Sequence, residues 1–376
     1  MNEGMKVDVI CLMEAGTERR RETVHGVDVL RVPLKRRRGG IFGYVFQYVA
    51  FLAMSSLIVA ARSLTGRYEL VYVHNMPDIL VLSALIPKIF GAKVILDLHD
   101  PMPELMMTIF NLRHDTLPVR ILKRLEKWSI RLADRALTVN LACKKLFASR
   151  SCRPDKIRVV MNSPDESIFT FRPVPSPSAP GRSQTSPFVI MYHGSLVERN
   201  GLDLAIEALA RVRPSVPNAE LRIYGAATPF LERVKESVGA KGMQEAVHYL
   251  GPKRAEEIAE AIEACDVGII PNHRSIFTEL NTPTRIFEYL ALGKPVIAPR
   301  APGITDYFDD DSLIVFELGD AEDLARRIEY VFFHGNDTTE IVKRGQEVYR
   351  AHAWREERQT LVTTTADLLR GEGRLV

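Results

Sequence analysis

The sequence predicts an α/β protein made of two Rossmann-like, doubly wound domains that face a central cleft. Three observations lead to this prediction. The chain has 376 residues, which is enough for two domains that each bury a core. In both halves, short apolar runs alternate with stretches of helical periodicity, the pattern of parallel sheets covered by helices. Between the halves, residues 166–187 are rich in Pro and Ser and are typical of a linker.

In the first half, residues 1–165, this pattern predicts an N-terminal Rossmann-like domain. Strands are expected at 7–12, 27–32, 70–73, 94–98, 136–139 and 157–161. Helices are expected near 41–62, 77–90, 118–132 and 141–150. We expect the strands on both sides of the first helix to belong to one sheet.

The second half, residues 188–345, repeats the alternation and predicts the other domain. Strands are expected at 188–192, 221–224, 247–250, 267–270, 296–298 and 313–316. Helices are expected near 201–213, 229–240, 254–264, 283–292 and 320–334. The last segment, residues 346–376, is helical in composition, and we expect it to pack back on the first domain.

The bulk composition excludes some classes of function. The formal net charge of +3 is close to balanced and argues against a dedicated nucleic-acid binder. The cysteines have no zinc-like spacing and are expected to be reduced packing residues, which favours the cytoplasm. The first apolar run, 7–13, is short and carries Asp8, so no cleavable signal peptide is expected.

Residues 41–61, IFGYVFQYVAFLAMSSLIVAA, raise the question of a membrane. They contain no charge and follow the basic run Lys35–Arg38. As a helix, the segment would be roughly 32 Å long, enough to cross a bilayer. Three interpretations stay open: a span, a helix on the sheet whose basic entry touches anionic lipid at the inner face of the membrane, and a core helix with a solvated charge run. A span would split the sheet that we expect around it.

Ligands of open α/β sheets bind beyond the carboxyl ends of the strands, where helix N-termini present unpaired N–H groups. The strand at 188–192 is followed by HGSLVERNG, in which Gly194 lets the backbone approach a ligand and Arg199 supplies a positive charge. This set suits a diphosphate. It is neither the dinucleotide fingerprint nor a P-loop. A glycine turn with a surface Arg is the alternative.

The stretch LNTPTRIFEYLALGKPVIA, residues 280–298, comes after the strand at 267–270, as HGSLVERNG comes after the strand at 188–192. It predicts a helix that begins near Pro283 and ends at Gly293, before the next strand. Arg285 and Glu288 lie one turn apart on this helix. A carboxylate near a helix start can accept hydrogen bonds from a ribose diol. An ordinary amphipathic helix with a solvated Arg–Glu pair is the alternative.

In the first half, the strand at 94–98 ends in DLHDPMPE. This run places His99 among three carboxylates at a strand end that faces the second domain. His99 is therefore a candidate for substrate contact, with a structural histidine as the alternative. Asp97 and Asp100 do not lie on one strand face and no second cluster supports them, so no metal is expected.

Together these motifs resemble a known family. The runs YHGSLVERNGLDLAIEAL, IYG, CDVGIIPN, NTPTRIFEYLALGKPVIA and DAEDLARRI resemble the nucleotide-sugar domain of family 4 retaining glycosyltransferases, which have the GT-B fold. In the first half, HGVDVLRVPLKRRRGG, YELVYVHNMPDILV, GAKVILDLHDPMPEL and RVVMNSPDESIF are similar to the acceptor-side domain. The resemblance covers nearly the whole chain. It implies hexosyl transfer from a nucleotide-diphosphate sugar to a hydroxyl with retained configuration, without an obligatory metal or other cofactor.

The resemblance also assigns roles to residues. Glu288 matches the second Glu of the family's Glu-seven-residues-Glu motif, which holds the donor ribose. Arg199 and Gly194 match the segment that grips the donor diphosphate, and Gly225 matches the loop near the nucleotide. His99 matches a histidine that contacts the transferred sugar. Retention in this family is described as front-face attack, so no separate nucleophile is assigned.

The sequence departs from the family pattern at several positions. The first Glu of the motif should stand at Leu280, and Asn200 and Ser195 stand where family members have basic residues. Arg274 or Arg285 is expected to restore the missing positive charge. The family usually begins with a strand, a glycine-rich loop and a helix, whereas this chain starts near the second strand.

The resulting hypothesis is a retaining hexosyltransferase that acts on a glycan or lipid-linked acceptor in surface polysaccharide biosynthesis. Its partners would be the nucleotide-sugar donor, that acceptor and an anionic membrane surface touched by Lys35–Arg38 and the helix at 41–61. Two alternatives remain. One is a non-catalytic nucleotide-sugar-binding relative or partner subunit, motivated by Leu280 and Asn200. The other is a sugar-nucleotide epimerase, for which no acid–base pair can be assigned.

Overall fold

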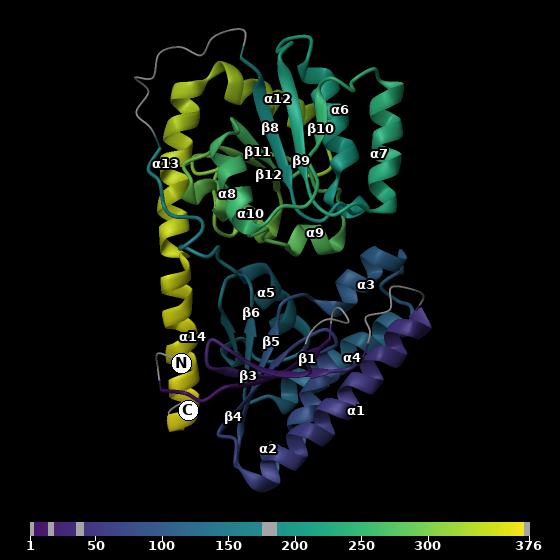
Figure 1. The fold of residues 1–376 in the computed structure, drawn as a ribbon, viewed down its shortest axis with the longest axis vertical. Helices are drawn as coiled ribbons and strands as arrows, with labels where there is room; N and C mark the ends of the chain where they lie inside the picture. The colour runs from purple at the N-terminus through teal and green to yellow at the C-terminus, as the bar shows by residue number, and fades with distance from the viewer. Residues whose placement is uncertain (1–3, 14–18, 35–40, 175–185, 372–376) are drawn as a thin grey trace.

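The computed structural model describes residues 4–13, 19–34, 41–174 and 186–371. Figure 1 shows two α/β domains arranged one above the other along the long axis of the molecule. Each domain contains a parallel sheet with helices packed against it. The predicted fold class is therefore confirmed.

The second domain is built on a six-stranded parallel sheet with the order β10-β9-β8-β11-β12-β13. Alternate residues of its central strand enter different cores: Ile190 and Tyr192 join the core on one face, and Val189 and Met191 join the core on the other. Because both faces are covered, the strands consist mostly of apolar residues. The strands are β8 (Phe188–His193), β9 (Ala219–Tyr224), β10 (Val247–Tyr249), β11 (Val267–Ile269), β12 (Val296–Arg300) and β13 (Ile314–Glu317).

Helices surround this sheet on both faces. Five of them, α6, α7, α8, α10 and α12, lie within two residues of the predicted boundaries, and the short helices α9 and α11 were not predicted. The helical segments are η3 (Glu198–Asn200), α6 (Leu202–Val212), α7 (Pro229–Ala240), α8 (Ala255–Glu263), α9 (Ile276–Leu280), α10 (Arg285–Ala291), α11 (Pro302–Thr305), α12 (Ala321–Phe333) and α13 (Gly335–Ala351).

The first domain has a four-stranded parallel sheet with the order β4-β5-β6-β7. Its strands are β4 (Leu70–His74), β5 (Lys93–Leu98), β6 (Arg135–Thr138) and β7 (Ile157–Val159). The helical segments around it are η1 (Asp78–Ala84), α2 (Leu85–Ile89), α3 (Met102–Phe110), α4 (Leu117–Leu132), α5 (Leu141–Arg150) and η2 (Pro154–Lys156). Helix α3 was missed because two prolines at its start hide the helical periodicity.

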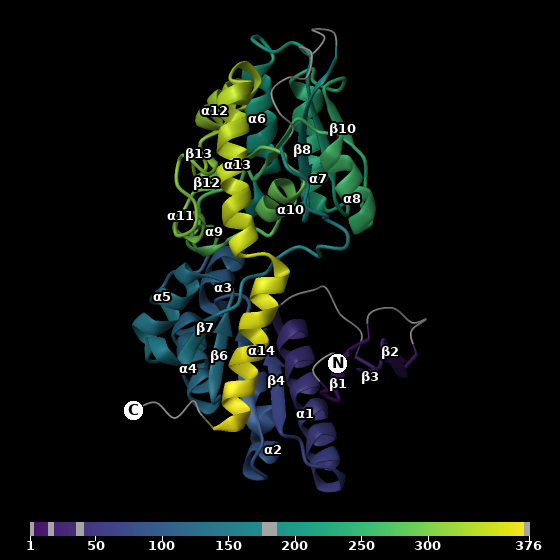
Figure 2. The same cartoon turned by 90° about the vertical axis from the view of Figure 1, so that its left-hand side faces the viewer.

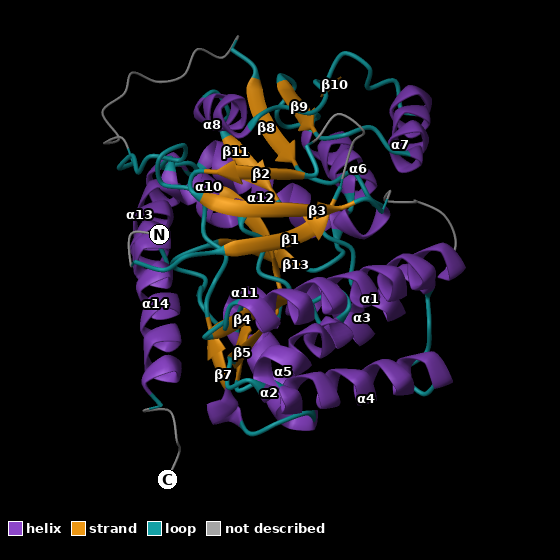
Figure 3. Cartoon of the chain, turned by 60° about the horizontal axis from the view of Figure 1, so that its bottom comes forward, coloured by secondary structure: helices purple, strands orange, loops and turns teal. Residues whose placement is uncertain are grey.

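The prediction of one sheet around the helix at 41–61 is wrong. The strands β1 (Asp8–Leu12), β2 (Arg21–Val24) and β3 (Val27–Val32) form a separate three-stranded sheet, which Figure 3 shows apart from β4, β5 and β7. Strand β2 is antiparallel to β3 and was not predicted, because its sequence RETV is polar and mostly exposed. His25 and Gly26 form the hairpin turn with φ angles of 48° and 81°, as a two-residue turn between twisted strands requires.

Helix α1 (Ile41–Thr65) lies between the two sheets in sequence and packs against η1 and α2. Arg62 near its end pairs with Asp8 of β1 at 2.9 Å. Its outer face carries apolar side chains, with Phe46 and Leu57 exposed to 74% and 72%. By length and composition, residues Phe46–Thr65 are sufficient to cross a membrane, and 11% of that stretch is buried. The basic run Lys35–Arg38 lies outside the described residues.

The chain passes between the domains at two neighbouring places. Residues 160–174 lead into the second domain, and α14 (Trp354–Arg370) returns along the sheet of the first domain (Figure 2). Leu361 and Leu368 of α14 pack against Ile95 and Leu137 of that sheet. Glu357 ties the two passages together, because its Oε2 accepts a hydrogen bond from the Met161 amide at 2.8 Å.

Candidate active site

The two domains meet where the strands of each sheet end. A small pocket there has His99 and Asp100 on the wall of the first domain, and Phe277 and Leu280 on the wall of the second. These residues follow β5 and β11, so the carboxyl ends of both sheets face the same cleft. This is where open α/β sheets bind ligands.

Two glycines bring the loops of the second domain close together. A Cβ atom on Gly225, which follows β9, would lie 2.2 Å from the carbonyl oxygen of Gly194, which follows β8. A Cβ atom on Gly194, where φ is 127°, would lie 3.2 Å from Nη1 of Arg285. Only glycine allows this close approach without displacement. The structure therefore brings Gly194, Gly225 and Arg285 into one place.

Glu288 is held by a histidine. His193, the last residue of β8, places its Nε2 atom 2.7 Å from Oε2 of Glu288. Its Nδ1 atom lies 3.0 Å from the hydroxyl of Tyr289, which also reaches the carbonyl of Met191 at 3.1 Å. Burial lowers the pKa of His193, against the opposing effect of Glu288, so the imidazole is neutral at pH 7.

This network fixes the proton of His193. A neutral imidazole has one N–H, and the ionised carboxylate of Glu288 can only accept a hydrogen bond. The proton therefore lies on Nε2, and Nδ1 faces the Tyr289 hydroxyl, whose single proton can go either to Nδ1 or to the Met191 carbonyl. One oxygen of Glu288 is held by the last residue of β8, while the other, Oε1, has no hydrogen bond to any residue that the structure describes. The side chain of Glu288 is 17% exposed.

Arg285 belongs to the same group of residues. Its guanidinium donates a hydrogen bond to the carbonyl oxygen of His193 and lies 5.0 Å from the ring centre of Tyr192. Arg285 and Glu288, one turn apart on α10, therefore contact the same residue of β8, one through its backbone and the other through its ring. The alternative of a solvated Arg–Glu pair is wrong, because neither side chain pairs with the other.

Arg199 lies on the short helix η3, between β8 and α6, at the side of the cleft. Its guanidinium carbon is 5.8 Å from the ring centre of Phe277. Burial raises the pKa of Asp100 in the first domain, and His99 and Arg199 oppose this rise. Among the described residues, Arg199 has no acidic partner within salt-bridge distance. It is thus a cation that faces the other domain.

Arg274 has a different environment. It forms a salt bridge with Glu279 at 3.1 Å and reaches Glu317 at 4.0 Å. Its charge is already compensated, so the structure does not join it to the group around Gly194 and Glu288. The position where the family motif has its first Glu, Leu280, packs against the core of the first domain and accepts a hydrogen bond from Asn140 Nδ2 at 2.8 Å.

In the first domain, the strand ends place a second histidine beside His99. His74 ends β4, and its Nδ1 lies 2.9 Å from His99 Nε2. The hydrogen bond to Asp97 raises the pKa of His99. Burial alone would raise the pKa of Asp97, but hydrogen bonds from His74 and His99 bring it below its usual range. His74 could have been found from the sequence, because β4 and β5 are neighbouring parallel strands that end at one edge.

The comparisons with known proteins agree with this architecture. Residues 178–348 match the family described as Glycosyl transferases group 1, and residues 1–163 match the Glycosyl transferase 4-like domain. A relative named for colanic acid biosynthesis, the glycosyltransferase WcaL of Escherichia coli, is 27% identical over 216 residues, which are 55% of this chain and 51% of that protein. The chain thus spans about half the length of the first curated relatives it matches.

Solved structures show the same fold. Sucrose-phosphate synthase from Thermosynechococcus elongatus superimposes with a TM-score of 0.76 at 16% identity, covering 98% of this chain and 90% of that chain. HepE from Anabaena, solved with UDP-glucose, superimposes with a TM-score of 0.66 at 16% identity, covering 91% and 87%. The fold is GT-B, and the two family matches together extend from residue 1 to residue 348. The chain therefore belongs to the group 1, GT4-like glycosyltransferases, a family of retaining hexosyltransferases.

Proposed function

We propose that the protein transfers a hexosyl group from a nucleotide-diphosphate sugar to a hydroxyl of a glycan or lipid-linked acceptor, with retained anomeric configuration, in surface polysaccharide biosynthesis. The observation that carries the proposal is the cleft in which the buried His193 holds Glu288 on one side and His99 lies on the other. The relative named for colanic acid biosynthesis and the solved neighbour with bound UDP-glucose support it.

The residues of the second domain would bind the donor. Oε1 of Glu288 would accept hydrogen bonds from the ribose diol, because His193 already occupies Oε2. The leaving diphosphate gains charge as the glycosidic bond breaks. Arg199 and the backbone N–H groups at the start of α6 would stabilise that charge, and the glycines at 194 and 225 leave room for it.

The residues of the first domain would position the sugar. His99 would contact the transferred hexose from the opposite wall, held by Asp97 and by the amide oxygen of Asn75, which accepts from the His99 backbone N–H at 3.1 Å. Closure of the cleft would exclude water, which otherwise hydrolyses the donor. No separate nucleophile is needed when the acceptor attacks from the face that the leaving group occupies.

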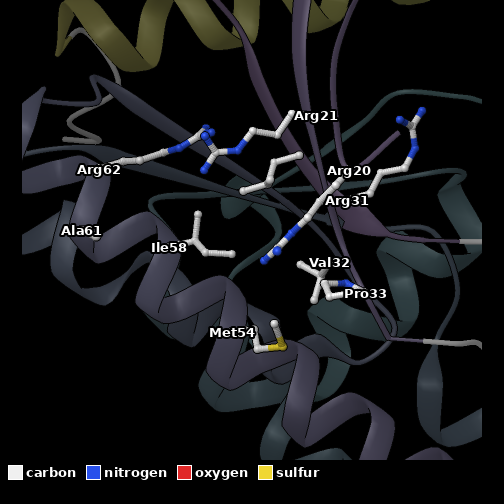
Figure 4. Close-up of a pocket in the computed structure, with 10 residues that line it drawn as sticks. Arg20, Arg21, Arg31, Val32, Pro33, Met54, Ile58, Ala61 and Arg62 are labelled. Atoms are coloured by element: carbon white, nitrogen blue, oxygen red, sulfur yellow. The ribbon is translucent and has the colours of Figure 1, made fainter. Parts of the chain in front are cut away.

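We propose a cytoplasmic location at the inner face of the membrane. Two features of the first domain support it. The exposed apolar face of α1 suits the boundary between lipid headgroups and acyl chains. Next to it, a pocket of about 220 Å³ is lined by Arg20, Arg21 and other basic side chains above an apolar floor from α1 (Figure 4). An anionic membrane surface would attract the basic side chains of the pocket, and its boundary region would accommodate the apolar face of α1.

The first experiment is calorimetric binding of UDP, GDP, ADP and CDP to the protein and to Glu288→Ala. We expect one nucleotide to bind, with UDP as the first candidate because a solved neighbour binds it, and we expect the binding to be lost in Glu288→Ala. Glu279→Ala is the matched control, since it removes a carboxylate nine residues earlier whose partner is Arg274. It should bind as the wild type does.

The outcomes separate the candidate functions. Binding that disappears in Glu288→Ala but not in Glu279→Ala would establish the donor site and name the donor base. Donor binding without turnover on any acceptor would favour the non-catalytic relative. Absence of binding to all four nucleotides would contradict the proposed donor site.

A further inference from the structure

Helix α4 of the first domain carries a row of exposed apolar side chains that the proposed reaction does not use. Leu117, Ile121 and Trp128 are exposed to 66%, 45% and 72%, and their spacing places them on one side of the helix. A row of large apolar side chains on the surface marks a site of interaction more often than a face that meets only water. The row indicates that α4 has a partner outside the domain.

Basic side chains accompany this row. Four of them are exposed on α4: Arg120, Arg124, Lys127 and Arg131. None of the four forms a salt bridge with a residue that the structure describes. The only acidic residue in the sequence of α4, Glu126, is fully buried and pairs with Arg150, whose Nε lies 2.9 Å from Oε1. The exposed charge of the helix is therefore entirely positive.

Helix α4 lies in the same layer of the first domain as α1. The core on one face of the sheet includes Phe51 of α1 and Ile130 of α4, whereas α14 packs on the other face. Both helices contact η1, and Figure 3 shows them running in nearly the same direction across this layer. Their outer sides therefore both face away from the sheet and from α14.

The two outer sides complement each other chemically. The α1 segment at 41–61 has no charge and exposes Leu57 to 72%, while α4 adds the basic side chains and Trp128. A membrane that contains anionic lipid offers partners for both, because negative headgroups attract Arg and Lys, and the boundary with the acyl chains accommodates apolar side chains and favours Trp. A nucleic acid would pair with the basic side chains but would leave the apolar row in water.

We propose that the outer side of α4 binds the interface of an anionic membrane, with Trp128 at the level of the headgroups and the four basic side chains against the lipid phosphates. This inference rests on the proposed membrane location and extends it from α1 to α4, but it does not depend on the transferase reaction. Helix α3 contacts both α4 and, across the cleft, α9 of the second domain. The membrane-bound layer would therefore lie close to the cleft, where a lipid-linked acceptor has to arrive.

Tryptophan fluorescence tests the contact, because the chain has two tryptophans and they lie on opposite faces of the sheet. Trp354 begins α14, so full-length Trp354→Phe reports on Trp128 alone. With vesicles of phosphatidylglycerol and phosphatidylcholine, we expect its emission to shift to shorter wavelength and to be quenched by lipids brominated near the headgroup. Trp128→Phe keeps only Trp354 and is the matched control, which should show neither change.

A pair of neutral substitutions tests the charges. Each basic side chain near an anionic surface strengthens binding, so Arg124→Gln combined with Lys127→Gln should weaken sedimentation with the same vesicles roughly 30-fold. Lys343→Gln combined with Arg344→Gln removes the same charge from exposed positions of α13 in the second domain and should bind as the wild type does. Circular dichroism spectra establish that each variant is folded.

The outcomes separate this inference from the proposals on which it rests. If the wild type sediments with anionic vesicles but the emission of Trp128 does not change, the role of α4 is overturned while the membrane location stands, and the row would then fit an acidic protein. Equal sedimentation of the α4 and α13 variants would also overturn it. A wild type that binds no vesicle would overturn both the role of α4 and the membrane location. Nucleotide binding is measured separately by calorimetry, so none of these results bears on the donor site.

Discussion

His193 orients the carboxylate of Glu288, the residue that the sequence motif assigns to ribose binding. The motif contains the carboxylate and not the imidazole, which lies 95 residues earlier at the end of β8. The imidazole gives Glu288 a hydrogen bond of 2.7 Å from a buried group, and Tyr289 fixes the other ring nitrogen. A carboxylate held in this way loses little side-chain entropy when a diol binds it.

Replacing His193 tests this support. His193→Phe fills similar space but donates no hydrogen bond, so we expect nucleotide affinity to fall roughly tenfold. His193→Gln offers an N–H near the place of Nε2 and should recover part of the loss. Calorimetric titration with the nucleotide that binds the wild type gives the comparison. Equal affinity in His193→Phe and wild type would contradict a role for the imidazole.

Asp78 predicts a pH dependence of stability. It is 4% exposed at the start of η1, and burial raises its pKa from 3.8 to about 7, although Asn75 donates a hydrogen bond to it. Between these two pH values the folded protein holds a proton that the unfolded chain has lost. The free energy of unfolding should therefore fall as the pH rises from about 4 to about 7.

Asp78→Asn should remove this contribution. We expect the variant to lose the decline in that range and to be at least as stable as the wild type at pH 8, in urea denaturation at several pH values. Asp115→Asn, which changes an exposed carboxylate, should keep the decline. A decline of the same size in Asp78→Asn would rule out Asp78 as its source.

The site residues show what the sequence could predict at this scale. Gly194 was found because it follows a strand, Glu288 because its helix follows one, and Gly225 through the family resemblance, and the structure brings all three to one end of the sheet. Their roles stay predictions. His74 and His193 were missed because their partners are distant in the sequence: Asp97 on β5 for His74 and Glu288 on α10 for His193. Arg274 was proposed as a donor contact, and its partner Glu279 could have been read from the sequence five residues away.

Among the elements, α1 has an exposed apolar face, which is compatible with more than one position relative to a membrane. Its apolar outer face has no counterpart among the described residues, and its length suits a bilayer as well as an interface. The separate sheet β1-β3-β2 removes the earlier argument that a span would split a continuous sheet. Vesicle binding can therefore distinguish a membrane-spanning helix from an interfacial one.

Leu57→Glu places a charge on the exposed face of α1. If the helix lies in the interface, we expect the wild-type protein to sediment with vesicles that contain anionic lipid, and the variant to bind roughly tenfold more weakly. Phe333→Glu, an exposed position on α12 of the second domain, is the control. Recovery of the wild type from membranes only with detergent would favour a span. If the wild-type protein stays in the supernatant with every lipid tested, both the interfacial helix and the span are contradicted.

The elements that were predicted share long apolar runs. The central strands of the second domain, β8, β11 and β12, were found because both of their faces are buried. Strand β2 was missed because it is short, polar and at the edge of its sheet. Helix α9 has five residues, too few for a periodic pattern, and a turn with a side-chain cap at Ser275 begins it. An element can be predicted from local sequence where burial requires a run or a period of apolar residues.

For the whole molecule, contacts across the cleft decide how the domains couple. The Leu141 backbone N–H at the start of α5 donates to the Tyr307 hydroxyl of the other domain at 2.7 Å. Tyr307→Phe leaves this N–H without that partner, and we expect the unfolding free energy to fall by about 1 kcal/mol. Hydrogen exchange of the Leu141 amide should become faster. Tyr330→Phe, on α12, should leave that exchange unchanged, and slow exchange in Tyr307→Phe would contradict the coupling.

The two passages of the chain between the domains lie side by side, and this sets how the cleft can open. Glu357 bonds the Met161 amide, Glu166 bonds the Arg355 amide at 3.0 Å, and Gln346 bonds the Arg172 carbonyl at 2.7 Å. The connections therefore act as a single seam along one border of the molecule. Rotation about this seam separates the opposite border most, so donor and acceptor would enter from the side away from α14, and residues near the seam would move least.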